Sequence, residues 1–468
     1  MESHFYGERE IDFDPRAIRE KGMPLRTSGG KAPGPAPLMT CLVNVNNVFK
    51  NAVTTRGIGT QLQPIEVFDI CCFIADMVLA GGQRRAALST LFSLDDNAML
   101  ESKFGNWWEN NPQRGRSNNS AVLLRSQITK EVFDGLWKKI EASGSGEPGI
   151  MFSDSADYGC NPCFEISLQC NELCNLVEID SSKITSQDDL EYCSRMAARI
   201  ATIQATYTDF HYLREVWRDT VEKEALIGVS LTGIASGAVT KLDMSAGAEK
   251  VIEENRVMAK KLGINPSARS TCVKPSGTAS LLLGTSSGVH AWYAPYYWRR
   301  VSVWKEEPIY AYLRDNHPEL LEDDYFKPTT MAKIKVPMKA PEGAALRYES
   351  ALSTLERVKL LQETWIAKGH VSGINKNNVS TTISVRPEEW AEVGEWMWEN
   401  RSSYTGIAVL PYDGGTYTQS PFEECTKEEY EEAVKYLTDI DLRDVYEGND
   451  NTSLQGEAAC AGGACEIK

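Results

Sequence analysis

The sequence predicts an α/β protein built on parallel strands. Strand and helix signals alternate through most of the 468 residues, which is the pattern of parallel strands joined by crossover helices. The segment 226–234 is apolar and β-branched with glycines at 228 and 233, as expected of a strand buried on both faces. Hydrophobic residues make up 42% of the chain, so the composition supports a large buried core.

Local signals place the other elements. A short strand is predicted over residues 9–18, before a loop rich in Gly and Pro over 29–37, where the backbone can approach a ligand closely. A helix is predicted over 64–80, because Pro64 suits its first turn and Gly81 its end. Its apolar spacing makes Cys71 and Cys72 core residues. Further helices are predicted over 188–217, 246–262 and 352–367, and short strands over 150–152, 379–385 and 407–410.

The charge balance narrows the classes of function. A net charge of −16, from 49 Lys and Arg against 65 Asp and Glu, predicts no broad basic surface for nucleic acid or an anionic membrane. A local nucleotide pocket is compatible with this charge. No apolar run reaches the ~20 residues that span a bilayer, and residues 1–6 lack a signal-peptide core. Twelve cysteines without a secretion signal predict a reducing, cytoplasmic location.

Four cysteines lie close together in the middle of the chain, at Cys160, Cys163, Cys170 and Cys174. Such density suits either metal ligation or thiol redox chemistry. A zinc site needs paired cysteines with a longer spacer, whereas only six residues separate these pairs and no His lies between them. We therefore predict no metal ligands here, and buried structural cysteines are the alternative for Cys160 and Cys170.

Cys163 has the most suggestive surroundings of the four. It follows Pro162, so it is not expected in the middle of a helix. If the segment is extended, alternate side chains share one side, and Asn161, Cys163 and Glu165 project together. An amide, a thiol and a carboxyl facing one space suit one-hydrogen chemistry, with the thiol as the reactive group and the carboxyl as general acid or base.

Two further stretches are candidates for ligand binding. Gly82, Gln83 and Arg84 follow the first predicted helix, and a guanidinium group suits phosphates and planar bases; solvated arginines on a turn are the alternative. Lys274 begins a run of small residues with hydroxyls and free N–H groups, which suits an anion, with a plain turn as the alternative. The run comprises Pro275, Ser276, Gly277, Thr278, Ala279 and Ser280.

The character of the chain changes near residue 439. Residues 439–457 are mainly acidic and polar without a periodic apolar face, and Cys460 and Cys465 flank a Gly-Gly pair. About twenty flexible residues span roughly tens of Å, so the tail could carry a dithiol into a distant pocket; incidental cysteines in a disordered tail are the alternative. We predict a main domain over 1–438 and a flexible acidic tail over 439–468.

The run Asn161-Pro162-Cys163-Phe164-Glu165-Ile166, followed by Cys174-Asn175-Leu176, resembles the active-site loop of ribonucleotide reductase catalytic chains. The match is best with the adenosylcobalamin-dependent (class II) kind, in its monomeric branch. Matching blocks cover nearly the whole chain in the same order: 28–38, 81–85, 105–108, 118–122, 228–233, 274–280 and 410–413. The resemblance implies a ten-stranded α/β barrel with the radical cysteine on a central finger loop.

The resemblance also implies roles for the residues of this loop. Cys163 would be the thiyl-radical cysteine that removes the 3′ hydrogen of the ribose, and Glu165 the base for the 3′ hydroxyl. Asn161 would hydrogen-bond the ribose hydroxyls. Cys174 would be one of two reducing cysteines that deliver electrons as the 2′ hydroxyl leaves as water.

Other matching residues acquire roles in the same way. Cys460 and Cys465 would be the tail dithiol that is recharged by thioredoxin or a glutaredoxin-like protein. The segment 275–280 would hold the phosphates of the ribonucleotide substrate. The loop with Gly82, Gln83 and Arg84 would link a dNTP or ATP effector to the substrate base.

The sequence departs from the family pattern at its start. The partner of Cys174 belongs on an early strand, yet no cysteine precedes Cys41, which lies in a predicted helix. An N-terminal part of the pattern is therefore expected to be missing. A companion chain that supplies this part is one alternative, and a non-catalytic nucleotide-binding fragment is another.

The expected radical source follows from the late strand over 407–410. Reductases that use a ferritin-like subunit carry two adjacent tyrosines there, whereas Tyr404 and Tyr412 flank this strand without being adjacent. The resemblance therefore implies adenosylcobalamin, with a ferritin-like partner as the alternative. The likeness to the monomeric branch implies triphosphate substrates.

Overall fold

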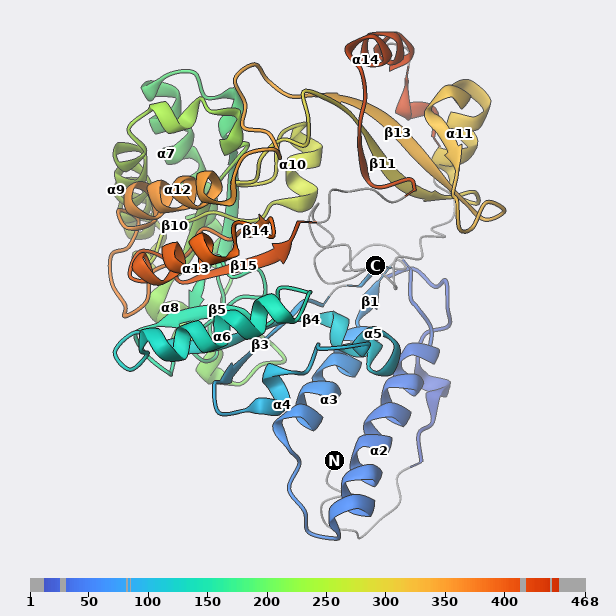
Figure 1. Cartoon of the computed structure of the whole chain (residues 1–468), viewed down its shortest axis with the longest axis vertical. Coiled ribbons are helices and arrows are strands. Elements are labelled where there is room, and N and C mark those ends of the chain that lie inside the picture. Colours follow the sequence, from blue (N-terminus) through green and yellow to red (C-terminus); the bar gives the residue numbers. More distant parts are fainter. Residues whose placement is uncertain are drawn as a thin grey trace.

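The computed structural model describes residues 12–25, 31–80, 83–84, 86–412, 418–437 and 440–445. Its centre consists of two neighbouring sheets (Figure 1). A three-stranded sheet has the order β10 (Thr271–Cys272), β9 (Ile227–Thr232), β8 (Asn175–Asp180). A five-stranded sheet has the order β14 (Thr382–Val385), β15 (Gly406–Pro411), β5 (Gly149–Ser153), β4 (Ser117–Leu124), β3 (Leu88–Ser93).

A short parallel bridge joins the two sheets between Val273 and Val379. The Val273 N–H donates to the Asn378 carbonyl at 3.2 Å, and the Ser380 N–H donates to the Val273 carbonyl at 2.9 Å. The eight strands therefore lie side by side in the order β8-β9-β10-β14-β15-β5-β4-β3. The first five are parallel to one another, and β5, β4 and β3 run in the opposite direction.

This arrangement confirms the predicted α/β class with parallel strands. The predicted ten-stranded barrel is not shown, because the described strands form no closed sheet. The β9 strand is buried along its full length, as its apolar sequence predicts.

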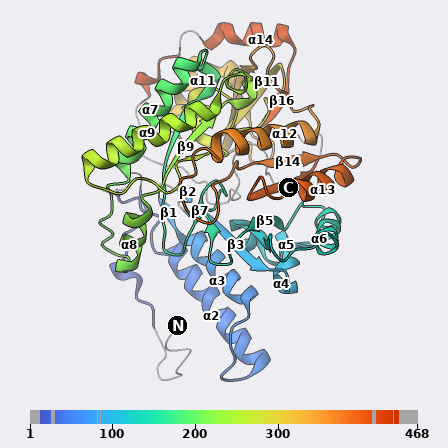
Figure 2. The same ribbon diagram turned by 90° about the vertical axis from the view of Figure 1, so that its left-hand side faces the viewer.

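Helices cover one side of these strands (Figures 1 and 2). α7 (Gln187–Gln204) packs on β8, β9 and on α9 (Met244–Leu262). Asp243 caps the start of α9, and Gly263 ends it in the left-handed conformation with a φ of 72°. α12 (Ala351–Leu361) packs on β14 and on α13 (Trp390–Glu399), which contacts α6 (Lys130–Ala142).

Some predicted elements differ from the structure. The helix expected over 64–80 ends at Met77, and Leu79–Ala80 form a short strand. The helix expected over 188–217 stops at Gln204 and resumes as α8 (Glu215–Glu224). The intervening side chains of Tyr207 and Tyr212 are 77% and 100% exposed, so this segment has no buried face to stabilise a helix. The strand expected over 9–18 is wrong in its described part, where Asp14 caps a 3-10 turn over Pro15–Ala17.

Most of the remaining elements lie at the two ends of the long axis (Figure 1). At one end are α2 (Ala36–Arg56), α3 (Pro64–Met77), α4 (Asn97–Leu100) and α5 (Trp107–Asn110). The hairpin of β1 (Leu79–Ala80) and β2 (Gln83–Arg84) follows α3 and lies nearer the middle. At the other end is an antiparallel sheet of β12 (Leu321–Asp323), β13 (Met331–Lys339), β11 (Tyr296–Trp304) and β16 (Phe422–Glu424), with α11 (Pro308–Asn316) and α14 (Lys427–Val434).

Trp365 fastens the helical layer to the strands. A π-helical turn over Gln362–Ile366 follows α12 and buries this indole completely. Its Nε1 lies 3.2 Å from the carbonyl oxygens of both Val229 and Cys272, so one donor spans β9 and β10. No helix among the described residues has the length and apolar character needed to cross a bilayer.

Candidate active site

The predicted finger loop is a small hairpin. β6 (Gly159–Cys160) and β7 (Ser167–Leu168) pair antiparallel, with Cys160 opposite Ser167. Between them the chain folds into a tight turn, in which the Ile166 N–H donates to Asn161 Oδ1 at 2.9 Å and the Phe164 N–H to the Asn161 carbonyl at 2.9 Å. Phe164 has a φ of 68°. The expectation of an extended segment is therefore wrong, because the turn redirects the side chains.

Contacts from opposite ends of the strand order hold the hairpin. Asn118 of β4 donates to the Pro162 carbonyl at 3.3 Å. Beside β14, Ser380 Oγ donates to the Cys163 carbonyl. At β9, a Cβ on Gly228 would lie 2.9 Å from Ile166 Cδ1, so the missing side chain makes room for the tip. Strands near both ends of the order thus touch the hairpin, which places it on one face that they share.

The turn leaves the Cys163 thiol and the Glu165 carboxyl in different surroundings. Cys163 is exposed, whereas Glu165 is 1% exposed. Burial raises the pKa of Glu165, while a hydrogen bond from the Asn161 side chain and the charge of Lys274 act in the opposite direction. Glu165 Oε2 has no hydrogen-bond partner among the described residues. A buried carboxyl with an open acceptor beside an accessible thiol can take a proton from a bound hydroxyl.

Cys174 lies just before β8 and is half-buried. Burial, with the carboxylates of Glu165 and Glu172, raises the pKa of its thiol to about 12. Cys163 also acts on this pKa, so the structure brings Asn161, Cys163, Glu165 and Cys174 into one neighbourhood. At neutral pH the Cys174 thiol is protonated, as a donor of hydrogen must be.

A further thiol near this group, Cys272, was not singled out from the sequence. It is fully buried on β10, and this burial, with smaller effects of Glu165 and Cys174, raises its pKa well above the ordinary value. Cys272 lies level with Ser230 and hence with Glu178 of β8. Cys174 packs against the buried cluster that contains Cys272.

Cys41 lies elsewhere. It is buried in α2 and faces α3, where burial and Asp76 raise its pKa. No group of three or more His, Cys, Asp or Glu side chains in the described ranges could hold a metal ion.

The small-residue run after β10 adjoins the same neighbourhood. Lys274 Nζ pairs with Glu178 at 3.2 Å, and the Lys274 N–H donates to Ser230 Oγ at 2.9 Å. The chain then turns through Ser276, with a φ of 49°, into α10 (Gly277–Leu283). Ser276 Oγ is buried without a hydrogen-bond partner among the described residues. The predicted run from Pro275 to Ser280 is therefore a turn and a helix start beside Lys274.

A cavity of about 190 Å³ lies beyond this run, between the loop after α10, the start of α12, β14 and the antiparallel sheet. Tyr293 and Phe422 line it, and Arg347 stacks on Tyr293 at 3.9 Å. Four buried polar atoms of its lining have no hydrogen-bond partner among the described residues: Thr285 Oγ1, Ser286 Oγ, Arg299 Nε and Arg347 Nε. His290 of the lining bonds β14, since its Nε2 accepts the Thr382 N–H at 3.2 Å.

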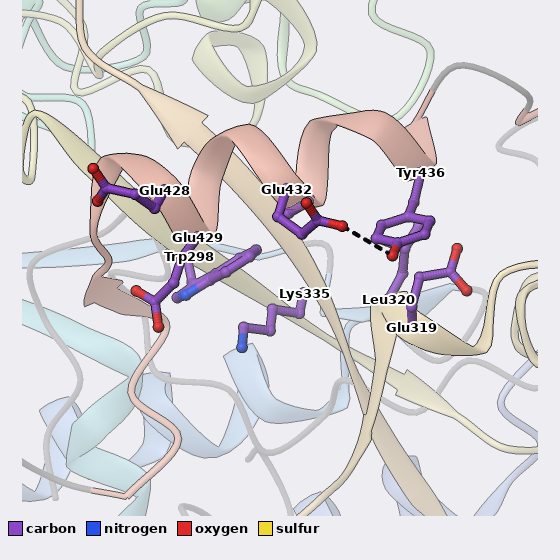
Figure 3. A pocket seen from close by; sticks show the side chains of 9 residues that line it. Trp298, Glu319, Leu320, Lys335, Glu428, Glu429, Glu432 and Tyr436 are labelled. Atoms are coloured by element: carbon purple, nitrogen blue, oxygen red, sulfur yellow. Dashed lines mark hydrogen bonds between the residues drawn. The ribbon is translucent and has the colours of Figure 1, made fainter.

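A larger hollow of about 440 Å³ lies under α14 (Figure 3). Lys335 Nζ lies 4.1 Å from the ring centre of Trp298, and Glu428, Glu429 and Glu432 approach from the helix. Trp298 alternates along β11 with Tyr297 and Arg299 of the smaller cavity. The hollow therefore opens on the other face of the antiparallel sheet, away from the finger.

Several predicted site residues are not placed. Gly82, Cys460 and Cys465 lie outside the described residues. Gln83 and Arg84 are described only as the backbone of β2, where Arg84 pairs with Leu79. Their roles stay predictions.

Among known proteins, this chain is similar to ribonucleotide reductases. No family model matches it. The adenosylcobalamin-dependent ribonucleoside-triphosphate reductase of Lactobacillus acidophilus is 30% identical over 98% of this chain, and that of Levilactobacillus brevis 28% over 100%. A crystal structure of a B12-dependent (class II) ribonucleotide reductase superimposes with a TM-score of 0.74 and 27% identity, covering 92% of this chain.

The chain covers only part of the length of each of these relatives. The chain spans 66% of the L. acidophilus protein, 68% of the L. brevis protein and 63% of the crystallised chain. Within that span the match runs through the finger hairpin and the strands around it. The chain belongs to the ribonucleotide reductase family.

Proposed function

We propose that this chain reduces ribonucleoside triphosphates to 2′-deoxyribonucleotides by thiyl-radical chemistry at Cys163. The observation that carries this is the finger tip, where an exposed thiol stands beside a buried carboxyl with an open acceptor. Relatives named as adenosylcobalamin-dependent ribonucleoside-triphosphate reductases support the substrate class and the cofactor. The chain spans only part of their length, so the activity of the whole enzyme is a proposal here.

Each residue of the finger has one task in this proposal. Cys163 removes the 3′ hydrogen of the ribose, and the Glu165 carboxylate accepts the proton of the 3′ hydroxyl. The Asn161 amide orients the ribose hydroxyls and bonds the Glu165 side chain. Cys174 supplies hydrogen as the 2′ hydroxyl leaves as water, and a second thiol completes the two-electron reduction. The run 275–280 and Lys274 bind the phosphates.

Adenosylcobalamin would supply the radical that activates Cys163. The cavity near the finger fits part of such a ligand, because cobalamin combines an apolar ring with many amide groups. Tyr293 and Phe422 would pack on its apolar surface. Thr285, Ser286, Arg299 and Arg347 would satisfy polar groups, since each has a buried atom without a partner among the described residues.

Further parts of the proposal concern the rest of the molecule. The eight strands would belong to a ten-stranded barrel in a main domain over 1–438. A tail over 439–468 would carry the Cys460–Cys465 dithiol, recharged by thioredoxin or a glutaredoxin-like protein in the cytoplasm, where thiols stay reduced. Gly82, Gln83 and Arg84 would connect a dNTP or ATP effector to the substrate base.

The direct test is conversion of CTP to dCTP by the purified chain with adenosylcobalamin and dithiothreitol. We expect dCTP to form. Formation only after adding a polypeptide with the remaining part of the relatives' length would establish an enzyme of two chains. Formation only with a ferritin-like metal protein would overturn the choice of cofactor. Nucleotide binding without turnover under all three conditions would contradict the proposal.

The pH dependence of turnover should report Glu165. We expect kcat/KM to rise with pH through the pKa of this carboxyl, because the base must be ionised. Replacing Lys274 with Met removes the positive charge that lowers this pKa, so the rising limb should move to higher pH. The matched control is Lys250→Met on α9, whose partner is Glu253. An unmoved limb in Lys274→Met would show that another group titrates.

A further inference from the structure

A buried charge cluster lies directly behind the turn that carries Cys174. Arg269 donates to Glu224 Oε2 at 2.6 Å and approaches both oxygens of Glu172 at 3.4 Å. The side chains of Arg269, Glu172 and Glu224 are 1%, 0% and 10% exposed. Two carboxylates thus share one guanidinium out of contact with water, and full ionisation leaves a net negative charge in the interior.

Such a cluster favours taking up one proton. Burial raises the pKa of Glu172 to about 7, and the neighbouring Glu224 carboxyl adds to this effect. The cluster is fixed from several sides. The Arg269 guanidinium stacks on Tyr158 at 5.7 Å, and a Cβ on Gly373 would collide with its Nη1. These contacts hold the guanidinium in one position between the two carboxyls.

The cluster also fixes the chain between β7 and β8. The Gln169 N–H donates to Glu172 Oε2 at 2.6 Å, and Gln169 Nε2 donates to Glu224 Oε1 at 2.7 Å. Asn171 sits in the left-handed conformation with a φ of 60°. Both ends of the turn therefore depend on the carboxyl pair, and Cys174 follows Glu172 by two residues.

We propose that Glu172, Glu224 and Arg269 control the reactivity of the Cys174 thiol, which becomes less nucleophilic when Glu172 gives up its proton. Glu172 is a positioning residue in this scheme, since it acts through the thiol. The consequence of this control for turnover rests on the proposed function, in which Cys174 is a reducing thiol. Near neutral pH, that thiol would respond to acidity through a carboxyl pair rather than through its own ionisation.

Glu165 is a second carboxyl whose charge acts on Cys174, and burial raises its pKa as well. The Glu172→Gln variant below separates the two carboxyls. Burial and the charge of Arg269 lower the pKa of His370 from its ordinary value, which places its titration below that of Glu172. An ionised Glu172 raises the pKa of Cys174. The groups that face the cluster or Cys174 are Tyr158 before β6, Cys163 and Glu165 of the finger, Glu224 of α8, Arg269 and Lys274 on either side of β10, and His370 and Lys376 after α12.

The test is the rate of Cys174 alkylation by iodoacetamide as a function of pH, in the full chain and without nucleotide or cofactor. Mass spectrometry of the peptide distinguishes Cys174 from Cys170. For an isolated thiol of high pKa, the logarithm of the rate rises with unit slope against pH. In the wild type we expect a flattening near pH 7, after which the line continues with a rate roughly three- to tenfold lower than its extrapolation.

Three variants test whether Glu172 causes the flattening. Glu172→Gln mimics the protonated carboxyl, so its line should be straight, equal to the wild type at pH 5.5 and above it at pH 8.5. Glu224→Gln removes a group that raises the pKa of Glu172, so the flattening should move to lower pH. Glu254→Gln, which changes a carboxyl paired with Arg199 on α9, should leave the profile unchanged.

Three outcomes would overturn the proposal. They are a straight wild-type line, a flattening that persists in Glu172→Gln, or a Cys174 that resists alkylation at every pH because access alone governs it. Circular dichroism checks that each variant is folded. Because no turnover is measured, failure of the proposed reductase activity would leave this result intact, and the reverse also holds.

Discussion

Replacing Cys163 with Ala abolishes deoxyribonucleotide formation, with an expected loss on the order of 10⁴-fold or more. No other side chain at the finger tip can replace it, because the tip presents this thiol to the exterior while Glu165 and Ile166 are buried. The readout is dCTP formed from CTP under the conditions in which the wild-type preparation turns over.

The loss should not come from misfolding. The Cys163 carbonyl, rather than its thiol, accepts the hydrogen bond from Ser380, so Ala keeps this anchor. Nucleotide binding and the circular dichroism spectrum should therefore stay as in the wild type. The matched control is Cys170→Ala, an exposed cysteine in the turn after the same hairpin, which should keep activity within a few-fold. Turnover by Cys163→Ala would refute the radical role.

Replacing Trp365 with Ala should lower the free energy of unfolding by roughly 3–5 kcal/mol. The indole is fully buried, and its Nε1 donates to the carbonyls of both Val229 and Cys272. Truncation leaves a large cavity and removes a donor from two buried acceptors, which adds to the cost. Urea unfolding followed by circular dichroism measures the change.

Two further variants separate the causes of this loss. Trp365→Phe fills most of the space but lacks the donor, so it should fall between Ala and the wild type. Trp108→Ala changes an indole that is 46% exposed and should cost about 1 kcal/mol or less. Equal losses in Trp365→Ala and Trp108→Ala would show that Trp365 does not fasten the helical layer to β9 and β10.

Residues close together in the sequence were predictable as a site. Asn161, Cys163 and Glu165 lie within one short motif, and the structure places them at one hairpin tip. The shape of the tip was not predictable from alternation, because an Asn side chain bonds the backbone across the turn and Phe164 adopts a positive φ. Local hydrogen bonding of this kind competes with an extended strand.

Site residues that strand register brings together could not be predicted from the sequence pattern. Cys272, Lys274 and Glu178 reach the finger only because β8, β9 and β10 align in parallel. Nothing near Glu178 in the sequence announces a partner at Lys274, almost a hundred residues later. The Glu172–Glu224–Arg269 cluster joins three distant segments in the same way. A motif therefore reveals its own reactive residues. The charged residues that shift their pKa values come together only when the sheet has assembled.

The anchoring of the finger has a consequence for the order of folding. Its two short strands pair locally, so the hairpin can form early, as contacts of low sequence separation do. Its docking on Asn378 and Ser380 closes loops of more than two hundred residues, and β5 must likewise find β15 across the chain. Such closures are slow. We therefore expect the geometry of the tip to be set late in folding, when the two sheets join at Val273 and Val379.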